Sequence, residues 1–252
     1  MHDATPGKVL VSREAGVMTL VFNRPEKKNA LDRGMYRVLI SALDAAANDA
    51  SIRVVLFCGA GPDFTAGNDL ADFRDFLDNP EEFPALAFVR ALAAFEKPMI
   101  AAVAGDAIGI GATLLFHCDL VYASPDARLV MPFIDLGLVP EAGASLLAPQ
   151  RLGMGRAAQY LLLGEPFSGE TAMRMGLVNE LAPAPQARAV AEAAARRLAA
   201  KPMAAVMAAR RLMRGDPAEL RARIDAEAKI FAQALASPQT RARLDAFFAR
   251  GR

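Results

Sequence analysis

The amino-acid sequence predicts an α/β fold, on three observations. Short apolar runs that end at a glycine, as in residues 51–59, are typical of buried strands. Segments with apolar residues at helical spacing alternate with these runs. After Pro183 the composition shifts to Ala and Arg, which favours helices. A chain of 252 residues with 54% hydrophobic and 23% charged residues is long and apolar enough to build a large core.

The N-terminal part of the chain begins with a predicted β-hairpin. Residues 9–23 contain two β-rich runs on either side of the turn at residues 14–16. Residues 29–47 then have the spacing of an amphipathic helix. The predicted buried face of this helix consists of Leu31, Met35, Val38, Leu39, Ala42 and Leu43. A buried strand is expected over 51–58, followed by a glycine-containing loop and helical character around 70–95.

The stretch 98–116 is nearly all apolar, and a membrane-spanning helix needs roughly 20 such residues. Asp106 and three nearby glycines interrupt it, however, and would weaken a helix at its centre. We therefore predict a strand over 99–104, a glycine turn, and a helix that starts near Gly111. Two further strands are expected within 119–132, and another helix near Pro140.

The C-terminal part of the chain is predicted to form several amphipathic helices. Pro202 and the sequence at 215–217 separate them. We expect a core at residues 1–190 and a helical region at residues 191–252. The 29 Lys and Arg residues offset 28 Asp and Glu residues, for a net charge of +1. The C-terminal arginines are therefore expected to form a solvated helix face and not a surface that binds nucleic acid.

Several kinds of site are excluded by composition and motif. The two cysteines, Cys58 and Cys118, form no Cys-x-x-Cys motif, so we expect neither a disulfide framework nor a metal site. The sequence before the hairpin lacks the apolar segment of a signal peptide, and we expect a cytoplasmic protein. His117 lies in an apolar run and is expected to be structural. No phosphate loop of the Gly-x-x-x-x-Gly-Lys type occurs, and the glycine turn at 105–114 matches the dinucleotide fingerprint only weakly.

Two glycine loops could carry chemistry. Residues 64–70, FTAGNDL, expose backbone where a strand ends, and residues 109–111 expose backbone where a helix begins. The first N–H groups of a helix have no intrahelical acceptor. Two such groups from separate loops could form an oxyanion hole, in which one donor contributes roughly 2.7–4 kcal/mol to transition-state stabilisation. Alternatively, these glycines have no catalytic role and are needed only to form tight turns.

Four segments in their order along the chain resemble landmarks of the crotonase superfamily, which comprises enoyl-CoA hydratases and isomerases. They are NRPEKKNALD, FTAGNDL, the region from Lys97 to Ser145, and GEPFSGETAMRMGLVNEL. The resemblance implies a spiral of ββα units with C-terminal helices that form trimers, or hexamers made of two trimers. It also implies an acyl-CoA thioester substrate, with coenzyme A carried as part of the substrate and no other cofactor. The two oxyanion-hole N–H groups would then belong to Ala66 and Ile110.

The resemblance further implies substrate contacts in the glycine loops, with Lys27 and Lys28 near the adenine and phosphate end of coenzyme A. The predicted substrate-binding residues are Lys28, Gly67, Asn68, Asp69, Gly109, Gly111 and Phe133. Hydratases of this family carry two glutamates, and their positions are occupied here by Thr113 and Phe133. Neither side chain can act as a carboxylate acid or base, so the usual hydration is not expected.

Glu141 occupies the position of the single base of some delta-3,delta-2-enoyl-CoA isomerases in the family. We therefore predict a shift of the double bond from position 3 to position 2, with Glu141 as the proton carrier. Apolar neighbours would exclude water and raise the Glu141 pKa. Glu141 could instead have only a structural role, in which its negative charge stabilises the N-terminus of a helix that begins at Pro140. Asp135 is a minor candidate acid, and Asp69 is expected to cap a helix that starts at Leu70.

Two other functions remain open. The chain could be a 2-enoyl-CoA hydratase that uses Glu141 alone with a positioned water. It could also be a catalytically weak subunit that binds acyl-CoA. Nicotinamide binding is a minor alternative, and no metal is expected.

Overall fold

The computed structural model describes residues 7–69, 72 and 84–250. Its strands are β1 (Val9–Glu14), β2 (Val17–Phe22), β3 (Val54–Gly59), β4 (Met99–Val103), β5 (Asp106–Ile108), β6 (Leu120–Ala123), β7 (Arg128–Val130), β8 (Phe167–Ser168) and β9 (Glu180–Leu181). Its α-helices are α1 (Arg33–Asn48), α3 (Ala85–Ala94), α4 (Ile110–Thr113), α5 (Ala144–Leu152), α6 (Met154–Leu162), α7 (Gly169–Arg174), α8 (Ala184–Ala199), α9 (Met203–Arg214), α10 (Pro217–Ala236) and α11 (Pro238–Arg250). Short 3-10 helices are η1 (Pro25–Lys27), η3 (Leu114–His117) and η4 (Ile134–Leu136).

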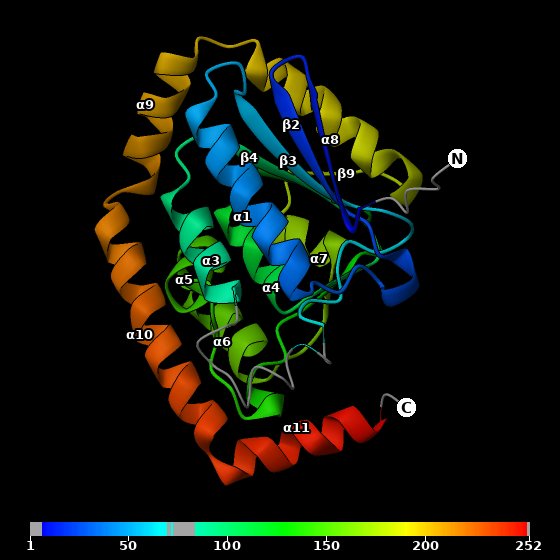
Figure 1. The fold of residues 1–252 in the computed structure, drawn as a ribbon, viewed down its shortest axis with the longest axis vertical. Helices are drawn as coiled ribbons and strands as arrows, with labels where there is room; N and C mark the ends of the chain where they lie inside the picture. Colours follow the sequence, from blue (N-terminus) through cyan, green and yellow to red (C-terminus); the bar gives the residue numbers. More distant parts are fainter. Residues whose placement is uncertain (1–6, 70–71, 73–83, 251–252) are drawn as a thin grey trace.

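One sheet organises the molecule, in the strand order β1-β2-β3-β4-β6-β9 (Figure 1). The hairpin β1–β2 is antiparallel, and the remaining neighbours are parallel. A smaller sheet contains β5, β7 and β8. Because β3 and β4 are parallel neighbours, their carboxyl ends lie at the same edge of the sheet. The first glycine loop follows β3 at this edge, and the chain after β4 leads through β5 of the smaller sheet to the second glycine loop. Open α/β sheets usually bind ligands at this edge.

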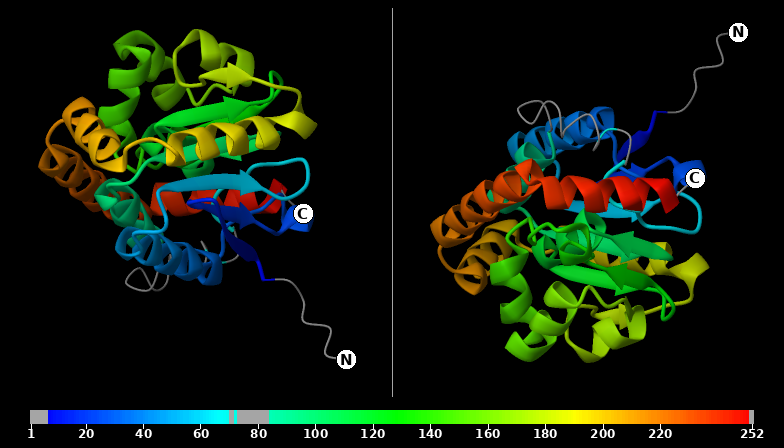
Figure 2. Two further views of the ribbon diagram at one scale, coloured as in Figure 1. Left: turned by 90° about the horizontal axis from the view of Figure 1, so that it is seen from above. Right: turned by 90° about the horizontal axis from the view of Figure 1, so that it is seen from below.

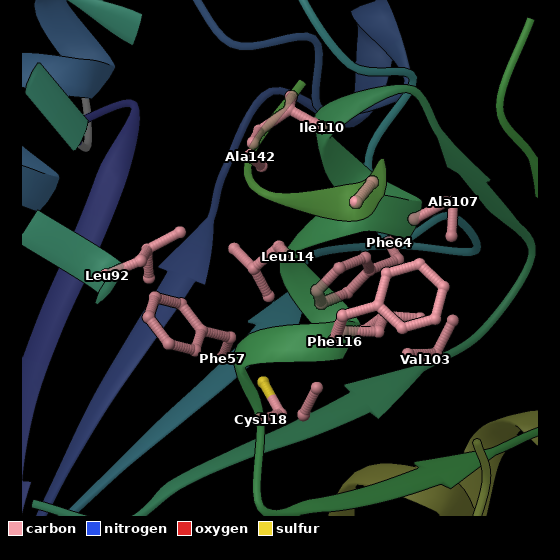
Figure 3. Packing of buried hydrophobic residues seen from close by; sticks show 14 of the residues in the cluster. Phe57, Phe64, Leu92, Val103, Ala107, Ile110, Leu114, Phe116, Cys118 and Ala142 are labelled. Atoms are coloured by element: carbon pink, nitrogen blue, oxygen red, sulfur yellow. The ribbon is translucent and has the colours of Figure 1, made fainter. Parts of the chain in front are cut away.

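Alternate residues of the central strands face two different layers. Val54, Leu56 and Cys58 of β3 belong to a cluster that packs against the alanines of α8. Val55 and Phe57 point the other way, into the main core. Figure 2 shows α8 along the sheet, and Figure 3 shows Phe57 in the main core with Ile110, Leu114 and Ala142. The sheet therefore separates a thin layer under α8 from the thick layer that contains the predicted site.

The structure confirms most of the predicted elements. The hairpin turns at Ala15 and Gly16, and α1 begins after Asp32, whose carboxylate accepts a hydrogen bond of 2.8 Å from Met35 N–H. The face of α1 was partly mispredicted, because Val38 is 42% exposed and Tyr36 is fully buried. The division predicted after residue 190 falls inside α8.

The apolar stretch 98–116 forms a strand, a turn and a short helix, as expected, with β5 as an additional strand. Among the residues that the structure describes, no helix is long and apolar enough to cross a membrane. The predicted helical character around 70–95 is confirmed for Ala85–Ala94, which form α3, while residues 70–71 and 73–83, with the proposed helix start at Leu70, lie outside the described residues.

One prediction near Glu141 was wrong. The helix expected near Pro140 begins only at Ala144, because Ala142 and Gly143 both have left-handed backbone conformations, with φ values of 60° and 71°. Glu141 therefore lies in a turn before the helix and not in its first turn. Asp135, the minor candidate acid, lies in η4 after the end of strand β7 at Val130, and it is exposed.

The helices α9, α10 and α11 form a C-terminal arm, in which α9 and α10 run along one side of the molecule and α11 crosses its lower end (Figure 1). Arg210 of α9 anchors the arm: its Nε donates to Asp119 at 2.8 Å, and its Nη1 donates to the carbonyl oxygens of Phe95 and Glu96 at 2.8 Å. A cavity of about 490 Å³ lies between α9, α10, α3 and α5, and Glu141 does not line it. The arm is thus joined to the core by buried polar contacts, as well as by apolar ones.

Candidate active site

The loop after β3 is held by the segment after η1 through backbone hydrogen bonds. Ala66 N–H donates to Lys28 O at 2.8 Å. Leu31 N–H donates to Gly67 O at 2.7 Å, and Leu31 O accepts a hydrogen bond of 2.9 Å from Asp69 N–H. Leu31 and the next loop residue, 68, form an isolated parallel bridge. In this arrangement the polar backbone groups of residues 67 and 69 face Leu31, whereas those of residue 68 face away.

The backbone donor of this loop differs from the one that the sequence predicted. Ala66 N–H is already bonded to Lys28 O, so this structure does not leave it available to a ligand. Gly67 N–H donates to Thr65 Oγ1 at 3.1 Å. Asn68 N–H has no acceptor among the residues that the structure describes, and Asn68 is only partly buried. Asn68 N–H is therefore the better candidate donor to an oxyanion.

The two glycine loops are in direct backbone contact. Thr65 N–H donates to Asp106 O at 2.9 Å, and Ile108 N–H donates to Thr65 O at 3.0 Å. A Cβ at Gly67 would lie 2.6 Å from Ile108 O, and a Cβ at Gly111 would lie 2.6 Å from Thr65 Cγ2. Both positions require glycine for this close approach, since real Cβ atoms do not come so near to other atoms.

Ile110 begins helix α4 directly beside this contact. Gly109 precedes it with φ 57° and ψ −119°, a conformation open to glycine, and turns the chain into the helix. The Ile110 N–H is at the first helical position, where a backbone donor has no intrahelical acceptor. The candidate donors Asn68 N–H and Ile110 N–H thus come from two loops that touch each other.

Glu141 lies beside α4 and accepts a hydrogen bond from Thr113, a residue of that helix. Thr113 Oγ1 donates to Glu141 Oε1 at 2.6 Å. Burial raises the Glu141 pKa from 4.5 to about 7, the Thr113 hydrogen bond opposes this rise, and the charge of Glu227 adds to it. The residue as a whole is only partly buried. A carboxylate of this kind is suited to accept and return a proton near neutral pH.

The sequence resemblance assigns Thr113 to the first glutamate position of the hydratases. Its side chain is fully buried, and its hydroxyl orients Glu141 instead of supplying a second carboxylate. The second such position, Phe133, is 6% exposed and lies in the main core at the turn after β7. The described residues therefore supply one carboxylate, not a pair, at these three positions.

His117 supports the turn that follows Glu141. Its Nε2–H donates to Ala142 O at 2.7 Å, since a carbonyl oxygen can only accept. Burial lowers the His117 pKa to about 4, so the ring is neutral at physiological pH. The prediction that His117 is structural is confirmed.

Tyr36 supports the loop that carries Asn68. Its hydroxyl donates to Asn68 Oδ1, and its ring is fully buried beside Phe88. Burial and the nearby Glu141 carboxylate raise the Tyr36 pKa well above 10. Tyr36 thus remains protonated and holds the side chain of the residue that offers the free backbone donor. Sequence reasoning missed it, because an aromatic residue in an amphipathic helix looks like any other core residue.

The charged residues predicted to contact substrate have partners within the protein. Lys28 Nζ lies 2.8 Å from Asp106 Oδ2, although the lysine side chain is 61% exposed. Asp69 Oδ2 lies 2.8 Å from Arg24 Nη1. Contacts of these residues, of the loop glycines and of Phe133 with a substrate stay predictions.

Known proteins resemble the chain along nearly its whole length. A model of the enoyl-CoA hydratase/isomerase family matches residues 12–252. Enoyl-CoA delta isomerase 2 of Rattus norvegicus is 39% identical over 181 residues, which cover 69% of this chain and 46% of the rat protein. The chain therefore spans about half the length of that relative. A 2,3-dehydroadipyl-CoA hydratase of Escherichia coli strain K12 is 32% identical over 243 residues, or 95% of each protein.

The solved structure of OdaA from Pseudomonas aeruginosa agrees with this fold at a TM-score of 0.91 and 44% identity, over 96% of this chain and 99% of that one. The family model and the fold thus cover the same residues, including both glycine loops and Glu141. The chain accordingly belongs to the enoyl-CoA hydratase/isomerase family, within the crotonase superfamily of acyl-CoA enzymes.

Proposed function

We propose that the chain is a delta-3,delta-2-enoyl-CoA isomerase in which Glu141 is the single catalytic acid and base. The observation that carries this proposal is the hydrogen bond from Thr113, which stands at the first hydratase glutamate position, to Glu141. One carboxylate with a pKa near 7 can move a proton in both directions. The name of the rat relative, a delta isomerase, is further support.

The proposed reaction moves one proton and one double bond. Glu141 takes a proton from C2 of the 3-enoyl thioester, and the C–H electron pair passes into a dienolate whose charge rests on the thioester oxygen. The N–H groups of Asn68 and Ile110 hold this oxygen. Glu141 then returns the proton to C4, so that the C3=C4 double bond becomes C2=C3. No atoms are gained or lost, and coenzyme A takes part only as a portion of the substrate.

A second candidate function is hydration of a 2-enoyl-CoA by Glu141 and a positioned water. The E. coli relative named a hydratase, which matches 95% of the chain, favours it. Hydration requires activation of water and protonation at C2. Two carboxylates can divide these two steps between them, whereas a single carboxylate must perform one after the other. The absence of a carboxylate at positions 113 and 133 therefore favours the isomerase.

The test is to offer the purified protein a 3-enoyl-CoA and, separately, a 2-enoyl-CoA, and to follow the products by mass and by conjugation. The isomerase converts the 3-enoyl substrate to a conjugated product of unchanged mass. A gain of one water on the 2-enoyl substrate alone would replace this proposal with the hydratase. Binding of both substrates without turnover would indicate the acyl-CoA-binding subunit.

The pH dependence of kcat/KM should rise from acid to neutral pH with a midpoint near 7. Only the ionised form of Glu141 can take a proton, and its pKa is about 7 because of burial. His117, with a pKa of about 4, is already neutral over this range. The measurement is kcat/KM for the 3-enoyl substrate between about pH 5 and 9. If kcat/KM does not change with pH while the chemical step limits the rate, Glu141 is not the base.

Thr113→Val is the matched variant for this profile. It keeps the shape of the side chain and removes the hydroxyl that stabilises the ionised carboxylate. The midpoint should therefore move to higher pH. An unchanged midpoint would mean that Glu141 is not the group that titrates.

The assembly and location of the protein also remain proposals. Helix α9 exposes Leu212 (85%) and Met213 (83%), which supports a subunit contact along this helix in a homotrimer or homohexamer. Sedimentation of the full chain would distinguish monomer, trimer and hexamer. The proposed role for Lys28 near the phosphates of coenzyme A rests on the sequence resemblance, whereas the proposed cytoplasmic location rests on the cysteine content.

A further inference from the structure

The turn that carries Glu141 is held from three sides. Ala142 and Gly143 both have left-handed φ values, 60° and 71°, which is an unfavourable conformation for alanine. His117 binds Ala142 O from the core side, and Thr113 binds the Glu141 side chain. Such a backbone persists only where its surroundings determine it. The remaining support comes from the C-terminal arm.

Helix α10 packs directly over this turn. A Cβ at Gly143 would lie 2.4 Å from Leu220 Cδ1 and 3.4 Å from Ile224 Cγ1, both on α10. One helical turn beyond Ile224, Glu227 is 5% exposed and directs its carboxylate at the turn. This residue is 86 positions after Glu141 along the chain, and the sequence gives no sign that the two meet.

The Glu227 carboxylate accepts three hydrogen bonds from the start of α5. Gly143 N–H donates to Oε2 at 2.6 Å, Ser145 N–H donates to Oε1 at 2.9 Å, and Ser145 Oγ donates to Oε1 at 2.5 Å. The N-cap residue of α5, Gly143, has no side chain to satisfy these groups. Glu227 therefore performs the capping from another helix, at the end of α5 where a negative charge is favoured.

We propose that Glu227 of the C-terminal arm is a positioning residue for Glu141, acting through the Gly143–Ser145 backbone. This inference rests on the proposed function in one respect only, that Glu141 carries the proton. Both carboxylate oxygens of Glu227 are used, so an amide at this position would turn its NH₂ group toward a backbone N–H. The turn would then relax and move the Glu141 carboxylate away from C2 of the substrate. A misplacement of about 1 Å can cost roughly 10²-fold in rate.

The test is Glu227→Gln in the full chain, compared with Glu219→Gln, which changes an exposed residue of the same helix. We expect Glu227→Gln to lower kcat about tenfold to 10²-fold per folded molecule, with KM within about threefold, because the predicted acyl-CoA contacts do not include this turn. Hydrogen exchange of the peptide that contains Gly143 and Ser145 should accelerate, while exchange in β3 and β4 stays as in the parent. Glu219→Gln should change neither quantity.

Three outcomes separate this inference from the proposed function. If kcat per folded molecule and the exchange rate both match the parent, Glu227 does not position the turn. If exchange accelerates at this turn but kcat is unchanged, the cap is structural and the positioning role is wrong. If the parent enzyme runs hydration instead of isomerisation, the same comparison is made with the 2-enoyl substrate, because Glu141 is the base in either reaction.

Discussion

Glu141→Gln should abolish most of the isomerase activity while leaving the fold intact or more stable. The amide has the shape of the carboxylate and can still accept the hydrogen bond from Thr113 through its oxygen. It cannot take up a proton from C2, and removal of a general base costs roughly 10²–10⁴-fold in rate. Because Glu141 is the sole base in this mechanism, the loss should be near the upper end of that range, as measured by kcat for the 3-enoyl substrate.

The stability of this variant provides a second measurement. A carboxyl whose folded pKa is raised from 4.5 to about 7 destabilises the fold as the pH rises between those values, because the folded state holds the proton more tightly than the unfolded state. Glutamine does not titrate, so it avoids this loss of stability. At a pH above 7 the melting temperature of Glu141→Gln should therefore equal or exceed that of the parent.

Comparing Glu141→Gln with the parent also tests whether Glu141 has only a structural role. Acyl-CoA binding should survive the substitution, since the two backbone donors and the glycine loops are unchanged. A variant that kept its full rate would eliminate Glu141 as the catalytic residue. A variant with a much lower melting temperature would instead show that the carboxylate is needed for folding.

Ile110→Pro should remove one oxyanion donor with little disturbance of the backbone. Proline is well tolerated at the first position of a helix, where its missing N–H has no intrahelical acceptor in any case. The loss of one donor to an oxyanion costs about 10²–10³-fold in kcat. The effect should appear mainly in kcat, since the negative charge on the thioester oxygen develops after binding.

Ile110→Val is the control for this variant, because it changes the side chain and keeps the N–H. Its kcat should remain within about threefold of the parent. Equal losses in the two variants would assign the effect to packing of the buried Ile110 side chain and would argue against the donor. Circular dichroism and melting of both proteins exclude a change of fold.

The sequence predicted the elements of this fold better than it predicted their contacts. Residues 98–116 could be assigned to a strand, a turn and a helix because glycines and a charge interrupt the apolar run, which is local information. The start of α5 was mispredicted because a proline at 140 resembles a helix start, whereas the left-handed Ala142 carries no clear signal of its conformation. Local propensity does not reveal a backbone that is stabilised by distant residues.

The same distinction applies to the site. Glu141 and Ile110 became candidates because they lie within segments that resemble a known family. The choice between Ala66 and Asn68 as donor depends on the pairing with Leu31, which no local pattern reports. The contributions of Tyr36 and Glu227 were missed for the same reason: each meets the site from a helix far away in sequence.

The two buried cysteines could report on how the molecule opens. Cys58 lies in the layer between the sheet and α8, while the carbonyl of Cys118 accepts a 2.6 Å hydrogen bond from Arg151, next to the anchoring contacts of the C-terminal arm. Burial raises the pKa of the Cys58 thiol to about 11 and that of Cys118 to about 12, so neither reacts readily while it is covered. A thiol reagent would therefore modify each one only when its own layer separates. The order in which the two are labelled under mild denaturation would show whether the arm or the α8 layer detaches first.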